Sequence, residues 1–268
     1  GDMQARGFLL GGTAGRTTLA GEGLQHQDGH SHILASTIPN CVSYDPAYAY
    51  ELAVIVHDGM RRMFAEQENV FYYISVMNEN YQQPALPQGI TDGIVKGMYL
   101  LHKHNDAQIQ LLGCGAILRE VIAAAELLEK EFNLSANVWS VTSFNELRRD
   151  GLDCERWNML HPDEPPRISF VEESLRDHQG PVVAATDYMK AYADQIREFV
   201  PHGYRTLGTD GFGRSDSRAQ LREFFEVNRN FVCLAALKSL AEDGCIENKL
   251  VADAIKKLGI DPNKPNPI

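Results

Sequence analysis

The residues with the clearest capacity for chemistry lie near the start of the chain, where His26, Asp28, His30 and His32 fall in one Gly-rich segment. Three imidazoles and a carboxylate could bind zinc. However, the H-x3-H-x-H spacing matches no common zinc pattern and no cysteine completes it, so we predict no metal site. The histidines could instead be solvated loop side chains. In a third interpretation, one or more projects into an active site and donates to a developing oxyanion or shuttles a proton.

Two further Gly-rich segments could bind phosphate groups. Residues 113–118 nearly match G-x-G-x-x-G, but Leu118 replaces the third glycine and no acidic residue follows where a ribose would be bound. A tight turn between a strand and a helix explains this segment better. Residues 208–217 resemble the start of the magnesium-diphosphate motif of thiamine enzymes, but Thr209 interrupts Gly-Asp-Gly and Asn228 lies too near to complete it. We therefore predict a helix N-terminus there, capped by Ser215 or Asp216.

A fourth group of residues, Arg156, Trp157 and His161, lies within one short segment. Arg, Trp and His side chains this close together could form a binding surface, because such residues concentrate at interfaces. A purely structural connection explains them equally well, and both interpretations stay open.

Composition limits the class of protein. The formal charge of −11 argues against a nucleic-acid groove, and 44% hydrophobic residues can build a substantial core. The five cysteines include no C-x-x-C pair, which predicts reduced, buried thiols in a cytoplasmic protein. No apolar run approaches the roughly 20 residues that cross a membrane.

Hydrophobic periodicity predicts strands that alternate with helices. Residues 1–32 indicate a loop-rich segment, and residues 82–89, with two prolines and a glycine, indicate a linker. The predicted strands are 38–44, 70–77, 108–112, 137–142, 182–185 and 204–207. The predicted helices begin at the Asp45–Pro46 pair and at the capping box of Ser143 and Glu146, and cover 116–132, 188–199, 217–226, 228–242 and 248–258. This order predicts an α/β fold with a mainly parallel sheet and helices on both faces.

Several longer phrases go beyond such patterns. They are GEGLQHQDGHSH at 21–32, IPNCVSYDPAYAYE at 38–51, MNENY at 77–81, DCERWNMLHP at 153–162, ATDYMK at 185–190 and LGTDGFGRSDS at 207–217. Together they resemble the homodimeric pyruvate dehydrogenase decarboxylating component of bacteria, in the transketolase superfamily. The resemblance runs from end to end of this chain but covers only the back of that family's longer polypeptide. The chain is therefore expected to begin partway through a domain.

The resemblance implies a domain organisation and a set of cofactors. Residues 1–85 would be the rear of the middle, aminopyrimidine-binding domain, and residues 86–268 the transketolase-like C-terminal domain. In the family, thiamine diphosphate and magnesium are held mainly by residues that would lie upstream of Gly1, as would the glutamate that generates the ylid. We therefore expect this chain alone to bind neither and to be inactive.

The resemblance also implies a reaction and a site residue. The family decarboxylates pyruvate and acetylates the lipoyl group of dihydrolipoyl acetyltransferase, and works as a homodimer. His26 matches the histidine of its G-L-Q-H loop that hydrogen-bonds the substrate adduct; His30 and His32 are expected to line the same loop. Two alternatives are a transketolase or other 2-oxo-acid decarboxylase of the superfamily, and a dimerisation or interaction module.

Overall fold

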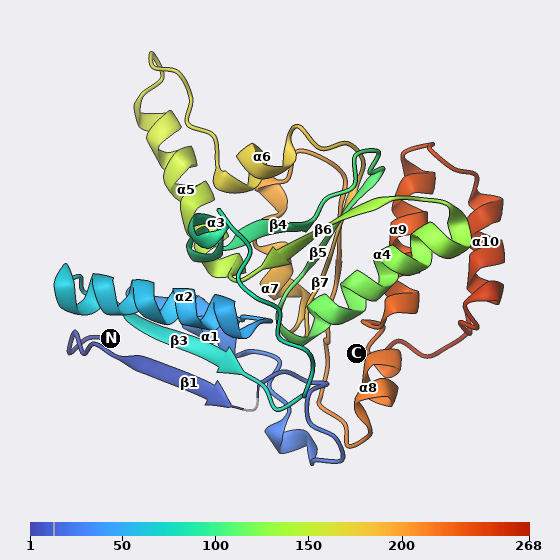
Figure 1. Cartoon of the computed structure of the whole chain (residues 1–268), viewed down its shortest axis with the longest axis horizontal. Helices are drawn as coiled ribbons and strands as arrows, with labels where there is room; N and C mark the ends of the chain where they lie inside the picture. The colour runs from blue at the N-terminus through green and yellow to red at the C-terminus, as the bar shows by residue number, and fades with distance from the viewer. Residues whose placement is uncertain (13) are drawn as a thin grey trace.

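The computed structural model describes residues 1–12 and 14–268, and its strands form two sheets (Figure 1). The first sheet is parallel, in the order β1-β3-β2, with β1 Phe8–Gly12, β2 Cys41–Tyr44 and β3 Phe71–Val76. The second has the order β4-β6-β5-β7-β8. Its strands are β4 Met98–His102, β5 Ile109–Gly113, β6 Ala136–Val141, β7 Val182–Ala185 and β8 Tyr204–Leu207. Only the edge strand β4 runs antiparallel to its neighbour.

Helices cover both faces of the second sheet, as the alternating pattern predicted (Figure 1). On β7, Val183 and Ala185 face a core with α4 Leu118–Phe132, α9 Arg229–Glu242 and α10 Asn248–Lys257. Val182 and Ala184 point to the other face, toward α5 Phe144–Leu160, α6 Phe170–Leu175 and α7 Lys190–Asp194. Because successive strand residues face opposite sides, a strand buried on both faces is apolar throughout. The predicted α/β fold is confirmed.

The first sheet packs against α1 Ser31–Ser36 and α2 Ala49–Met60, which continues into a π-helical turn, Arg61–Ala65. Its core contains Tyr72 and Ile74 of β3 and Ile55 of α2, and also Ile94 and Tyr99 from the segment that follows the linker. Buried Glu51 strengthens this join, because its Oε1 accepts hydrogen bonds from Tyr99 OH at 2.7 Å and Ser140 Oγ at 2.6 Å. The two sheets therefore share one packed junction.

Asp45 does not cap α2 as predicted. The cap is Tyr48, and the carboxylate of Glu51 accepts from the backbone N–H groups of Ala47 and Tyr48. Asp45 is instead buried at the junction of the two sheets, where its N–H donates to Thr142 O at 2.8 Å. A tertiary contact has thus displaced a locally plausible helix cap. The predicted strand at 38–44 is also shortened, because the residues before Cys41 form a turn.

The second block also differs from prediction in places. The short helices α3 Thr91–Lys96 and α6, and the edge strand β4, were missed because their periodic segments are short. The predicted helix at 188–199 is broken into α7 and a 3-10 turn, Arg197–Phe199. Helix α8, Arg218–Phe224, is capped by Ser217, whose side chain accepts from Gln220 N, rather than by Ser215 or Asp216. β1 lies inside the segment predicted to be loop-rich.

The prediction of buried cysteines is correct for three of the five. All five thiols are free, and Cys41, Cys114 and Cys233 are buried. Cys154 is half-buried and Cys245 is exposed.

In the part of the chain that the structure describes, no helix is long and apolar enough to cross a membrane.

Candidate functional site

The carboxyl ends of strands from both sheets meet at one junction. Arg16, which follows β1, donates its N–H to Asp187 O at 3.2 Å, just beyond the end of β7. Asp45, which follows β2, accepts at its carbonyl from Gly115 N at 3.2 Å, just beyond β5. In open α/β sheets, ligands bind outside the carboxyl ends of the strands, because loops and helix N-termini converge there. The rim of this junction is therefore the candidate site.

His26 lies next to a residue that contacts this rim, because Gln27 accepts at its carbonyl from Nη1 of Arg16 at 3.5 Å. His26 ends a 3-10 turn, Leu24–His26, within the segment 21–30, which we call the histidine loop. Its imidazole is exposed, and its backbone N–H donates to Gly23 O at 3.1 Å. An exposed ring on an ordered turn can meet a substrate and donate a hydrogen bond to it.

His30 and His32 lie in different environments from His26. The Nε2 of exposed His30 is 3.4 Å from a guanidinium nitrogen of Arg16, which can only donate, so this Nε2 must act as an acceptor. His32 is fully buried in α1, stacked on Tyr192 at 4.7 Å with its Nε2 3.1 Å from Ser75 Oγ. Burial lowers the pKa of His32 to about 3, so its ring is neutral. The structure therefore separates the three histidines that the sequence groups together.

No group of three or more His, Cys, Asp or Glu side chains that could hold a metal ion is found within residues 1–12 and 14–268. The histidine segment does not converge on one point, because His32 points into the core while His26 and His30 lie at the surface.

Two buried carboxyl groups lie at the centre of the junction. Burial raises the pKa of Asp45 to about 7, although Ser75 Oγ donates a hydrogen bond to it. Burial likewise raises the pKa of Asp187 to about 6, against hydrogen bonds from Thr17 N and from Thr17 Oγ1, the latter at 2.7 Å. Gly15 lets the backbone before Thr17 approach the Asp187 carboxyl group this closely. It adopts φ of +94°, and a Cβ there would lie 2.2 Å from Asp187 Oδ2.

The raised pKa of Asp45 predicts a pH-dependent stability. In the folded chain Asp45 keeps its proton up to about pH 7, whereas the unfolded chain releases it near the ordinary aspartate pKa of 3.8. The folded state then binds more protons across this window, so Asp45 makes stability fall as pH rises from about 4 to about 7. Asp45→Asn stays neutral and lacks this loss. Between pH 5 and pH 8, the free energy of unfolding of the variant should rise by about 2–3 kcal/mol relative to that of wild type. Urea unfolding at both pH values measures this change. If the difference in unfolding free energy between variant and wild type were the same at pH 5 and pH 8, the prediction would be contradicted.

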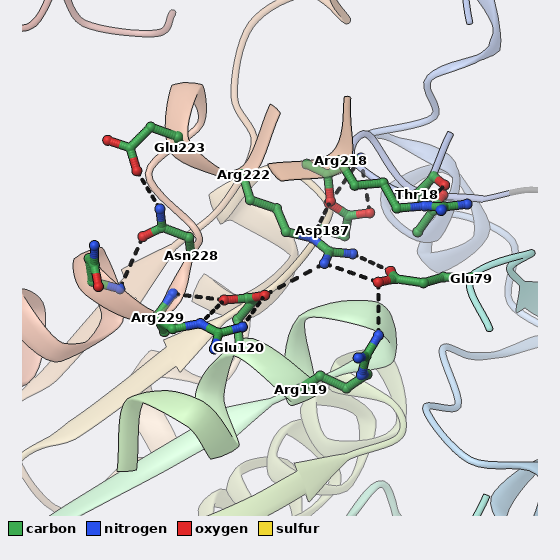
Figure 2. A network of polar contacts seen from close by, with 12 residues as sticks. Thr18, Glu79, Arg119, Glu120, Asp187, Arg218, Arg222, Glu223, Asn228 and Arg229 are labelled. Carbon is green, nitrogen blue, oxygen red and sulfur yellow. Dashed lines mark hydrogen bonds and ion pairs between the residues drawn. The ribbon is translucent and has the colours of Figure 1, made fainter. Parts of the chain in front are cut away.

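A buried arginine connects four segments around the same junction. Figure 2 shows Arg222 of α8 between Glu79, which follows β3, and Glu120 of α4. Its Nε also donates to Thr17 Oγ1 at 3.2 Å. Burial favours neutral Glu79, but the hydrogen bond and charge of Arg222 outweigh it, so the pKa of Glu79 is lowered. Arg222 therefore favours the ionised form of Glu79, whereas Arg229 is the main cause of the lowered pKa of Glu120, and Arg222 ties the two sheets together.

Two family models match the chain. One, described as the pyruvate dehydrogenase E1 component middle domain, matches residues 1–84, and the other, the transketolase-like TK C-terminal domain, matches residues 97–228. The pyruvate dehydrogenase E1 component of Pseudomonas aeruginosa is 65% identical over all of this chain, which spans 31% of that protein. The Escherichia coli K12 protein of the same name is 60% identical, again over the whole chain and over 30% of the relative. This chain belongs to the pyruvate dehydrogenase E1 family.

Solved structures agree with the fold. A transketolase mutant from Pichia stipitis superposes with a TM-score of 0.63 over 86% of this chain and 30% of its own, at 16% identity. A split-gene transketolase, described as an inactive beta4 tetramer, has a TM-score of 0.56 over 87% of this chain and 65% of its own, at 18% identity. The chain thus combines E1 middle-domain sequence with a transketolase-like structure.

Other segments of this E1-family chain have structural explanations. Residues 113–118 form the predicted tight turn into α4. Trp157 stacks on His161 at 4.4 Å between ring centroids, and the Arg167 guanidinium lies 4.3 Å from the Trp157 ring, so this group ties the end of α5 to the following loop. The junction residues Arg16, Asp187 and Arg222 were missed. Only the polar run after β1, T-A-G-R-T-T, gave a signal at sequence level.

Proposed function

We propose that this chain is part of an enzyme that decarboxylates pyruvate with thiamine diphosphate and acetylates the lipoyl group of dihydrolipoyl acetyltransferase. The supporting observation is its identity of 65% over its full length with an E1 component, of which it spans about a third. Within the proposal, residues 1–85 are the rear of the middle domain and 86–268 the C-terminal domain. The enzyme is a homodimer and magnesium accompanies the cofactor.

His26 is proposed as the residue of this chain that meets the substrate. Nucleophilic attack on the carbonyl carbon of pyruvate places negative charge on an oxygen beside a carboxylate. A preorganised N–H donor stabilises such charge more than it stabilises the neutral carbonyl, and so lowers the barrier. The exposed His26 ring, next to Gln27 whose carbonyl contacts Arg16 of the junction, supports this role. The carbanion chemistry itself is supplied by thiamine diphosphate when bound.

The described residues do not by themselves fit a diphosphate-magnesium site. Asp210, the best candidate ligand, accepts from Lys190 N at 3.0 Å and lies 3.9 Å from Lys190 Nζ, so its carboxylate already has partners within the chain.

We expect the isolated chain to show no micromolar binding of thiamine diphosphate at millimolar magnesium. Titration calorimetry measures this directly. The positive control is a full-length polypeptide, as long as the relatives, that includes this chain. Micromolar binding by the isolated chain would show that the cofactor site lies within these residues, and would overturn the assignment.

Substrate preference separates the proposal from another decarboxylase of the superfamily or a transketolase. In the full-length polypeptide, pyruvate should be turned over with a higher kcat/KM than longer 2-oxo acids, and ketose phosphates should give no product. The acceptor should be a lipoyl domain. Transfer from a ketose phosphate to an aldose, or a preference for a branched 2-oxo acid, would favour the alternatives.

A further inference from the structure

The side chain of Gln27, next to His26, is buried between two loops. Its Oε1 accepts from Arg214 N at 2.6 Å, and its Nε2 donates to Arg214 O. Both hydrogen bonds go to the backbone of one residue, so they fix the distance between the loops and their relative orientation. Arg214 is itself anchored, because its guanidinium lies 4.1 Å from the ring of Phe224 in α8.

The two loops approach so closely that Gly213 is required. A Cβ at this position would lie 2.8 Å from both Cβ and Oε1 of Gln27 and 2.9 Å from Leu24 O, closer than real Cβ atoms come. A second link lies before His26, where Gly21 N donates to Asp216 O at 2.8 Å. The segment 213–216 thus holds the histidine loop on both sides of His26.

The far end of the histidine loop is fixed as well. Met189 N donates to Gly29 O at 3.0 Å, and the Asp28 carboxylate accepts from His30 N and Ser31 N, each at 3.0 Å. Buried Arg16 donates to Gln27 O at 3.5 Å. The His26 ring is exposed, so what these contacts fix is the position of its backbone and therefore the point from which the ring projects.

We infer that Gln27 is a positioning residue: it clamps the histidine loop to segment 213–216 and thereby aims His26 at the substrate. This inference rests on the proposed function. It also means that segment 213–216, beyond β8, can influence the reaction without contacting the substrate. A displacement of about 1 Å of a catalytic group can cost as much as 10²-fold in rate, so two hydrogen bonds can matter to turnover.

Three variants and a control test the clamp. Gln27→Met keeps the length and volume of the side chain but loses both hydrogen bonds, and Gln27→Glu keeps only the acceptor. Gly213→Ala forces the loops apart while Gln27 remains, and it serves if Gln27→Met does not fold. Gln83→Met is the matched control, because Gln83 Oε1 also accepts from a backbone N–H, that of Ala49, at 2.9 Å.

In the full-length enzyme, Gln27→Met and Gly213→Ala should lower kcat by about 10- to 100-fold while changing thiamine diphosphate affinity less than about twofold. Gln27→Glu should fall between them and wild type, and Gln83→Met should keep its kcat. Combining Gln27→Met with His26→Ala should reduce kcat no further than His26→Ala alone, because both act through one group. Full additivity in the double variant, or normal turnover in Gln27→Met, would overturn the inference.

Hydrogen exchange on the chain itself gives a readout that does not depend on activity. Gln27→Met should speed amide exchange over residues 21–30 and leave the core strand β5 unchanged. Unchanged exchange in the loop would also overturn the clamp. If His26→Ala keeps normal turnover while loop exchange responds to Gln27→Met, the clamp stands and the proposed role of His26 fails.

Discussion

Replacing Arg222 by methionine should lower the free energy of unfolding by about 3 kcal/mol, because it removes one charge partner from buried Glu120 and from partly buried Glu79. Arg222 is 6% exposed and binds Glu79, Glu120 and Thr17 together. Glu79 retains Arg119 at 2.8 Å and Glu120 retains Arg229 at 3.0 Å. The loss should therefore lie at the low end of the range of about 3–5 kcal/mol for breaking a buried ion pair. Urea unfolding of the chain measures it.

Two further variants test whether the cost comes from the loss of one charge partner at Glu79 and Glu120. Adding Glu79→Gln and Glu120→Gln to Arg222→Met should recover part of the lost stability, because the two side chains that Arg222 had bound are then neutral. Arg205→Met is the matched control: Arg205 pairs with Glu242 at 2.6 Å, but both side chains are more than a third exposed. It should cost at most about 1 kcal/mol. Equal losses for Arg222→Met and Arg205→Met would contradict the junction as described.

The sequence predicts the second sheet well because its signals are local. Strands such as β5 and β7 are short apolar runs, and α4 repeats Val121, Ala124 and Leu128 on one face, so each element can be identified without knowing its neighbours. Predictions failed where distant residues decide the outcome. Asp45 is a good N-cap by type, but its burial against Thr142 and Ser75 takes it away from α2.

The candidate site was less predictable than the fold. The resemblance proposed His26 as a site residue, but nothing in the segment 26–32 indicates that His32 turns into a tyrosine-lined core while His26 stays at the surface. The clamp joins Gln27 to Arg214, 187 residues along the chain, and Arg222 meets Thr17 across 205. Contacts of such separation depend on how the two sheets pack, and a single sequence carries no local sign of them.

His26→Ala should have the largest effect on catalysis, lowering kcat in the full-length enzyme by about 10²- to 10³-fold, the usual cost of losing one preorganised donor. His30→Ala should lower it less, because its Nε2 faces Arg16 and cannot donate from that atom. His32→Ala should act through stability instead, since the ring is buried among Tyr73, Tyr188 and Tyr192. The three variants therefore separate substrate contact from loop structure and from core packing.

The most direct test compares kcat for pyruvate with the dissociation constant of thiamine diphosphate in wild type, His26→Ala and His30→Ala of the full-length enzyme. Because the charge develops only as the substrate reacts, His26→Ala should lose at least about 10² in kcat while its cofactor affinity stays within a few-fold of wild type. Near-normal turnover in His26→Ala together with a large loss in His30→Ala would assign the role to His30. Near-normal turnover in both would leave the histidine loop merely solvated and contradict the proposed site.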